Sequence, residues 1–180
     1  MGATLVQCLA AGRNKHMIRS GVSIAGSFLR ETCRWLDFMW LLPFVKGVHL
    51  ETIHVEFIQK TLGPMSHSLN TPWDHLFFQH ENTESDAAFE LFQKNWEPLS
   101  VCLVSQISSV FDVQGLLSHP GNKPYNSILK EIEIPMCCIA GSMDSQCPPD
   151  DMKKASSLMQ NSTFKCFGKK SGQECEYGHF

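Results

Sequence analysis

The feature that most constrains this chain is an unbroken apolar run over residues 134–140, which ends at Gly141. Its length and continuous hydrophobicity are typical of a strand buried on both faces, as in the interior of a parallel sheet. Asp144 follows in a short loop, and the prolines at positions 148 and 149 favour the start of a helix. Because loops at the carboxyl ends of parallel strands carry the chemistry of open α/β sheets, Asp144 is a candidate functional residue.

A second strand and loop follow that helix. We expect the helix over residues 150–159, and residues 162–167 alternate as a short strand that Gly168 closes. A polar loop then leads to Gly178, His179 and Phe180. An acidic residue and a histidine therefore each follow a predicted strand, with a strand–helix–strand unit between them.

The stretch from residue 129 to Asp144, followed by Cys147-Pro148-Pro149 and by Gly178-His179-Phe180, resembles the C-terminal third of α/β-hydrolase-fold proteins. In that family the aspartate of a Gly-x-x-Asp loop orients the histidine that acts as general base. The chain looks most similar to lipase- and esterase-like serine hydrolases with a large helical insertion. The resemblance implies a partial α/β-hydrolase fold, a parallel sheet with helices on both faces and a helical cap. The resemblance also implies that Asp144 and His179 are catalytic residues.

The start of the chain, Met1-Gly2-Ala3, looks like the second half of the family's nucleophile elbow, Gly-x-Ser-x-Gly. A helix is expected from there to Gly12, and its small residues would let it pack tightly beneath the sheet. The resemblance then implies that the chain begins one residue after the nucleophile. The serine would be absent, the backbone N–H of Met1 would take the oxyanion position, and the chain alone would be inactive.

Ser23 offers a rival nucleophile, because residues 21–25 read Gly-Val-Ser-Ile-Ala. The residues just before them include Lys15, His16 and Arg19, which fit poorly with the buried strand that must deliver a nucleophile. We therefore interpret residues 17–28 as the strand after the elbow helix and Ser23 as an ordinary strand residue. Ser23 as nucleophile stays the open alternative.

Residues 35–120 exceed what the sheet needs, and we interpret them as a helical cap inserted in a single truncated domain spanning residues 1–180. Apolar spacing predicts helices within it at 50–62, 84–96 and 98–111. The aromatic residues near its start would either line a lid over an acyl substrate or pack the cap onto the sheet: Trp35, Phe38, Trp40 and Phe44. Packing is the commoner role of such aromatic stripes.

The composition of the chain limits the kinds of partner that we expect it to bind. A formal net charge of −3, from 15 basic and 18 acidic residues, offers no basic stripe for nucleic acid. No apolar run reaches the ~20 residues of a membrane span, so we expect no transmembrane segment. Scattered cysteines favour free thiols in a reducing, cytoplasmic compartment over a disulfide framework. The spacing of histidines and cysteines fits no zinc site, and we expect neither metal nor cofactor.

Two functions of different classes remain. The first is a serine hydrolase with a Ser-Asp-His triad, of which this chain holds a fragment, acting on a small-molecule ester or acyl substrate with an apolar part. An acyltransferase fragment is a variant of it, since acyl transfer uses the same acyl-enzyme and differs in the acceptor. The second is a catalytically inactive binding or interaction module.

Overall fold

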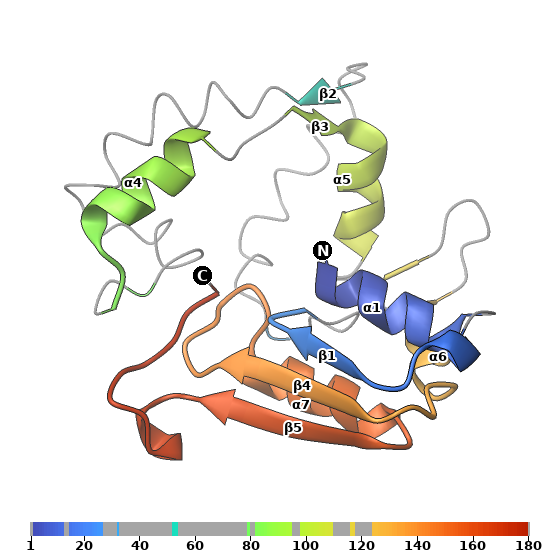
Figure 1. The fold of residues 1–180 in the computed structure, drawn as a ribbon. Coiled ribbons are helices and arrows are strands. Elements are labelled where there is room, and N and C mark those ends of the chain that lie inside the picture. Colours follow the sequence, from blue (N-terminus) through green and yellow to red (C-terminus); the bar gives the residue numbers. More distant parts are fainter. Residues whose placement is uncertain are drawn as a thin grey trace.

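The computed structural model describes residues 2–12, 15–26, 32, 52–53, 79, 82–94, 98–109, 116–117 and 124–179. Figure 1 shows the elements that these residues form. In chain order they are α1 (Gly2–Ala11), η1 (Lys15–Met17), β1 (Gly21–Ile24), β2 (Thr52–Ile53), α4 (Ser85–Lys94), β3 (Leu99–Ser100), α5 (Val101–Ser108), α6 (Asn126–Leu129), β4 (Met136–Gly141), α7 (Pro149–Leu158), β5 (Ser162–Phe167) and η5 (Lys169–Ser171).

The main sheet has three parallel strands in the order β1-β4-β5, which confirms the parallel sheet predicted from the sequence. β4 is the central strand, as its unbroken apolar run indicates, and its Cys138 pairs with Ser23 on one side and with Phe164 on the other. All three strands run in the same direction, so their carboxyl ends share one edge of the sheet (Figure 1). That edge is where the loops carrying Asp144 and His179 begin.

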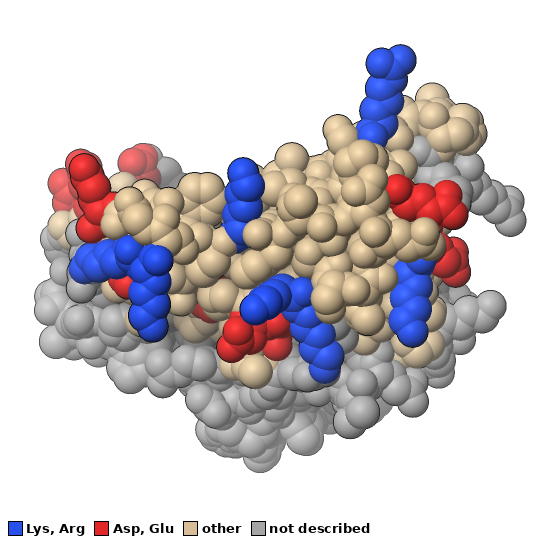
Figure 2. Space-filling view, turned by 90° about the horizontal axis from the view of Figure 1, so that it is seen from below, with Lys and Arg blue, Asp and Glu red and all other residues tan. Residues whose placement is uncertain are grey.

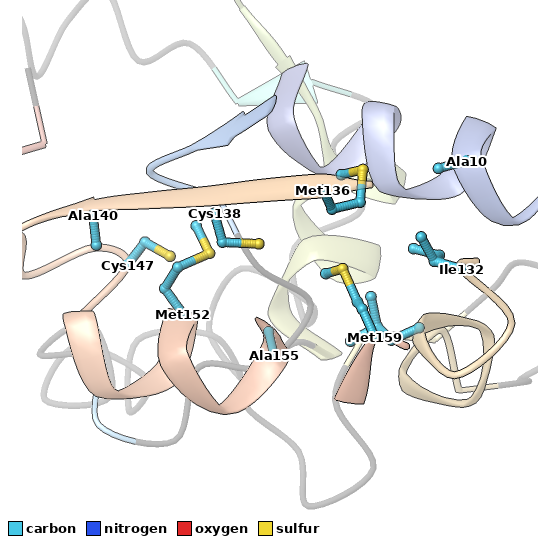
Figure 3. Packing of buried hydrophobic residues seen from close by; sticks show 10 residues of the cluster. Ala10, Ile132, Met136, Cys138, Ala140, Cys147, Met152, Ala155 and Met159 are labelled. Atoms are coloured by element: carbon cyan, nitrogen blue, oxygen red, sulfur yellow. The ribbon is translucent and has the colours of Figure 1, made fainter. Parts of the chain in front are cut away.

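One face of the sheet is covered by α1 and α7. Residues in register on parallel strands share a face, so Gly21 and Ser23 point to the same side as Met136 and Cys138. On that side α1 contributes Gln7, which bonds to Ser23, while α7 packs Met152 and Ala155 against β4 (Figure 3). The buried hydrophobic residues form one cluster: Ala10, Leu129, Ile132, Met136, Cys138, Ala140, Cys147, Met152, Ala155 and Met159.

The other face of the sheet carries the alternate residues of β1. Val22 is 52% exposed and Ile24 is 62% exposed, although both are large and apolar. The resemblance predicts helices on both faces, and α1 and α7 supply them on the Ser23 face. β1 is also an edge strand of the described sheet, so its outer backbone groups lie beside these exposed side chains.

Local sequence explains where α1 and α7 begin. Pro149 occupies the first turn of α7, where its missing N–H costs nothing, and Asp150 and Asp151 place negative charge at the positive end of the helix. α1 starts with small residues because it lies very close to the end of β1. A Cβ on Gly26 would lie 2.5 Å from the Cβ of Ala3, so the pair leaves no room for larger side chains.

The predicted cap region, residues 35–120, is described in part. Helices α4 and α5 lie within the ranges 84–96 and 98–111 that the apolar spacing predicts. The helix predicted from residue 50 is wrong at Thr52–Ile53, because these β-branched residues pair antiparallel with Leu99–Ser100 instead. The four aromatic residues of the predicted lid lie outside the described residues. The boundaries of the cap and of the 1–180 domain stay predictions.

Two surface properties bear on the expected partners. Lys and Arg side chains alternate with Asp and Glu over the face shown in Figure 2, so the described surface there carries both signs of charge. Within the described ranges, no helix combines the length and the apolar character needed to cross a bilayer.

Candidate active site

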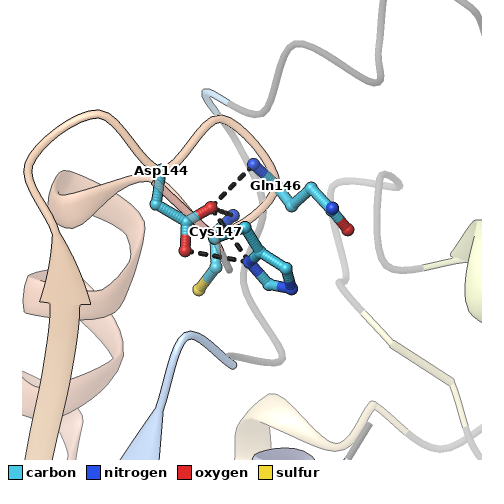
Figure 4. A network of polar contacts seen from close by, with 4 residues as sticks. Asp144, Gln146 and Cys147 are labelled. Atoms are coloured by element: carbon cyan, nitrogen blue, oxygen red, sulfur yellow. Dashed lines mark hydrogen bonds and ion pairs between the residues drawn. The ribbon is translucent and has the colours of Figure 1, made fainter. Parts of the chain in front are cut away.

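Asp144 lies in the turn that leaves β4. Its backbone N–H donates to the carbonyl of Gly141 at 3.2 Å, which closes the turn. Its side chain is buried, and Oδ1 accepts hydrogen bonds from the backbone N–H groups of Gln146 at 2.9 Å and Cys147 at 2.8 Å (Figure 4). Two backbone amides thus hold the carboxylate in place. One oxygen, Oδ2, is left facing another partner.

That partner is His179. Its Nδ1 lies 2.9 Å from Oδ2 of Asp144 and 3.1 Å from Oδ1, although 35 positions separate the two residues in sequence. The Asp144 side chain is fully buried, while the His179 side chain is 16% exposed. An ionised carboxylate only accepts, so a neutral imidazole would make this contact with its proton on Nδ1. This is the tautomer that a general base needs.

The loop that carries His179 is fixed to the Asp144 turn by its backbone. Met143 donates its N–H to the carbonyl of Tyr177 at 2.8 Å, and Ser142 donates its N–H to the carbonyl of Phe167 at 2.8 Å. The ring of Tyr177 packs edge-on against that of Phe167, with centroids 6.3 Å apart. The Asp144 turn, the end of β5 and the His179 loop therefore form one connected unit.

A side-chain pair adds to this connection. The hydroxyl of Ser142 donates to Oε2 of Glu176, and the same oxygen accepts from the backbone N–H of Lys169 at 3.3 Å. The hydrogen bond from Ser142 is the main reason that the pKa of Glu176 lies below its usual value; the N–H and charge of Lys169 and the charge of Lys170 act in the same direction. Glu176 is therefore held as a carboxylate.

The region predicted as a cap also reaches this loop. Asn82, which precedes α4, donates from Nδ2 to the carbonyl of Glu176 at 2.7 Å. Its own turn is closed by hydrogen bonds to the carbonyl of Gln79, from Asn82 N–H at 3.1 Å and from the Thr83 hydroxyl at 2.9 Å. A residue 94 positions away in sequence thus contacts the backbone close to His179.

The remaining candidates have different positions. Ser23 lies inside β1, is fully buried, and its hydroxyl donates to the carbonyl of Gly26 at 3.0 Å while accepting from Nε2 of Gln7 at 2.9 Å. A nucleophile needs an exposed turn between strand and helix, and this position inside a strand differs from it. Met1, expected at the oxyanion position, lies outside the described residues.

The sequence predicts Asp144 and His179 as site residues, and the structure brings these two side chains together, but the sequence did not single out the residues that hold them. Ser142 directly follows the glycine that ends β4, and Glu176 stands three residues before His179. Neither position has a periodicity or a motif that would have singled it out, and Asn82 lies far away in sequence. Over the described ranges, no three His, Cys, Asp or Glu residues gather as a metal ion requires.

Solved protein structures resemble this chain in their fold. No protein-family model matches the sequence, and no curated protein matches it significantly. Among solved structures, an esterase from Exiguobacterium antarcticum aligns with a TM-score of 0.58 at 12% identity, covering 98% of this chain and 56% of the esterase. A monoacylglycerol lipase from Paleococcus ferrophilus aligns at 0.54 and 14% identity, covering 99% and 56%.

An alpha/beta fold family hydrolase from Bacillus anthracis str. Sterne aligns with a TM-score of 0.53 at 13% identity, covering 99% of this chain and 58% of the hydrolase. The chain thus spans little more than half the length of these three structures. At such identities the likeness concerns the arrangement of strands and helices. This chain has part of the α/β-hydrolase fold.

Proposed function

We propose that Asp144 and His179 are the acid and the general base of a serine-hydrolase site that acts on an ester or acyl substrate. The observation that carries the proposal is the 2.9 Å hydrogen bond between Nδ1 of His179 and the buried carboxylate of Asp144. Both residues follow parallel strands at the edge where α/β sheets place their chemistry. The partial α/β-hydrolase fold supports the same assignment.

The proposed reaction is acyl transfer through a serine. As the serine oxygen attacks the carbonyl carbon, Nε2 of His179 takes the hydroxyl proton and then delivers it to the leaving alcohol oxygen. Water attacks the acyl-enzyme in the second half, with His179 again taking and returning a proton. Asp144 keeps the imidazole in the required tautomer and stabilises the imidazolium, while backbone N–H groups bind the oxyanion.

The serine is the part that the described residues do not place beside His179. Ser23 is fully buried within β1, and the hydroxyl of Ser142 is engaged with Glu176. Loss of the nucleophile lowers turnover by about 10⁶-fold in such sites. We therefore propose that the 180-residue chain alone is inactive and that Met1 contributes its N–H to the oxyanion hole.

The substrate proposed is a small-molecule ester or acyl compound with an apolar part. The solved neighbours include an esterase and a monoacylglycerol lipase, and the region at 35–120 would act as the cap over such a substrate. Free thiols at the described cysteines fit the cytoplasm as its compartment. An acyltransferase would use the same residues with another acceptor.

The test uses the protein isolated from its own cells, with either parent or H179Q sequence in its gene. We expect the isolated protein to hydrolyse p-nitrophenyl butyrate, with activity lost in H179Q and kept in H16Q, a variant at an exposed histidine of η1. The recombinant 180-residue chain should show no hydrolysis. An isolated protein without activity would contradict the hydrolase and favour the binding module.

A further inference from the structure

We infer that Ser142, Glu176 and Asn82 are positioning residues for His179, and that Asn82 couples the inserted region to the geometry of the histidine. The inference rests on the proposed function, since it concerns how the proposed base is held. The observation behind it is that three separate parts of the chain bond to the residue pair 176–177, just before Gly178 and His179.

The carboxylate of Glu176 connects the His179 loop to two other parts of the chain. It binds the hydroxyl of Ser142, in the turn that carries Asp144, and the backbone N–H of Lys169, directly after the loop leaves β5. The Ser142 oxygen also accepts the N–H of Tyr177 at 3.4 Å. The pair therefore fastens the His179 loop to the segment that carries Asp144, at a point two residues from that aspartate.

Only a short stretch of backbone separates residues 176 and 177 from His179. The carbonyl of Tyr177 accepts the N–H of Met143 at 2.8 Å, so the backbone is fixed at residues 176 and 177. One residue, Gly178, separates this fixed backbone from His179. Glycine has the widest choice of backbone angles, so His179 would adopt several positions if the hydrogen bonds of residues 176 and 177 were lost. The orientation of the imidazole thus depends on the bonds of residues 176 and 177.

Asn82 contacts the same loop from a distant part of the sequence. Its amide donates to the carbonyl of Glu176 at 2.7 Å, from a turn that lies just before α4 and within the inserted region at 35–120. The side chain is exposed, so it does not belong to the hydrophobic core. If the turn that carries Asn82 were displaced, this hydrogen bond would break and the carbonyl of Glu176 would lose the Asn82 donor. Displacement of the Asn82 turn would therefore reach the proposed base.

The experiment observes His179 directly in the 180-residue chain. Histidines are labelled with ¹⁵N, the His179 signal is assigned as the one that H179Q removes, and exchange of its Nδ1 proton with solvent is measured by NMR. We compare S142A, E176A and N82A with matched controls at exposed positions: S157A in α7, E174A in the loop and N161A before β5. Thermal melts of every variant report folding separately.

We expect the Nδ1 proton to exchange roughly fivefold faster in the three test variants, the factor that loss of one average hydrogen bond produces. The controls should match the parent, and S142T, which keeps the hydroxyl, should restore slow exchange. Should S142A fail to fold, N82A at an exposed site still provides the test. Exchange in N82A and E176A equal to their controls would overturn the inference.

The result is separate from the proposed function because the measurement needs no nucleophile and no turnover. Slow exchange that the three variants accelerate would support the positioning role even if no esterase activity were found in cells. Absence of a protected Nδ1 proton in the parent chain would overturn both the inference and the Asp144–His179 pair on which the proposed function stands.

Discussion

A methyl group on Gly141 would lie 2.5 Å from the carbonyl oxygen of Gly178, the residue directly before His179. The carbonyl of Tyr177 would lie equally close, and both neighbours are backbone atoms that have no rotamer to change. The loop carrying the proposed base therefore rests directly on the glycine that ends β4. This close approach explains why a glycine stands three residues before Asp144.

The substitution G141A should move the His179 loop away from Asp144. We expect a loss of about 1–3 kcal/mol in the free energy of unfolding, as for overpacking in a closely packed site, together with faster exchange of the His179 Nδ1 proton. The matched control is G21A in β1, where the nearest atom is the flexible Sδ of Met136. Equal urea midpoints and equal His179 exchange for G141A and the parent would contradict this contact.

Removal of the Asp144 carboxylate should destabilise the turn as well as the pair. In D144A the N–H groups of Gln146 and Cys147 lose their acceptor, and the expected cost is about 2–3 kcal/mol in urea unfolding. D144N keeps an oxygen for these donors and should cost less, yet it should lose the His179 tautomer. D150A, at an exposed position of α7, serves as the control. Equal stability of D144A and D144N would refute the role in the turn.

The Ser23 hydroxyl should matter for stability and not for chemistry. S23A leaves Nε2 of Gln7 with the carbonyl of Gly26 as its one acceptor, so we expect a cost of about 1–2 kcal/mol. S157A, at an exposed hydroxyl, should stay within about 0.5 kcal/mol of the parent. Loss of fluorophosphonate labelling in S23A would show instead that Ser23 is a nucleophile.

Glu176 should make the stability of the chain depend on pH. Its pKa in the folded chain lies below the ordinary value of 4.5, chiefly because of the Ser142 hydrogen bond. A carboxyl with a lowered pKa stabilises the fold above its unfolded pKa and loses that contribution as the pH falls through the folded value. Melting temperatures of parent and E176Q should therefore differ at pH 7 and converge below about pH 4.5. A difference between parent and E176Q that stays constant from pH 7 to 3 would count against it.

The exposed apolar side chains of β1 should promote self-association. Val22 and Ile24 are more than half exposed on an edge strand of the described sheet, a combination that favours pairing between chains. The double variant V22T/I24T keeps β-branched residues and lowers hydrophobicity, so light scattering of the 180-residue chain should fall at equal concentration. T163V, which adds an exposed apolar group to β5, should raise it. Scattering that is unchanged in both variants would contradict this role of the surface.

The strands of the sheet could be predicted because their signals are local. The apolar run before Gly141 marks a central strand, and the order of Asp144 and His179 after successive strands predicts that they meet. The contacts that hold the histidine could not be predicted, since Ser142 and Asn82 meet Glu176 only through the fold. A helix at residues 52–53 was predicted from apolar spacing alone, and strand pairing with Leu99–Ser100 overrode it.

The measurement that tests the central claim most directly is the position of a fluorophosphonate label on the protein isolated from its own cells. Such probes form a covalent bond with an activated serine. We predict one labelled serine peptide, with labelling lost in H179Q and D144N because both variants break the Asp144–His179 hydrogen bond. No label, or a label that persists in H179Q and D144N, would contradict the account.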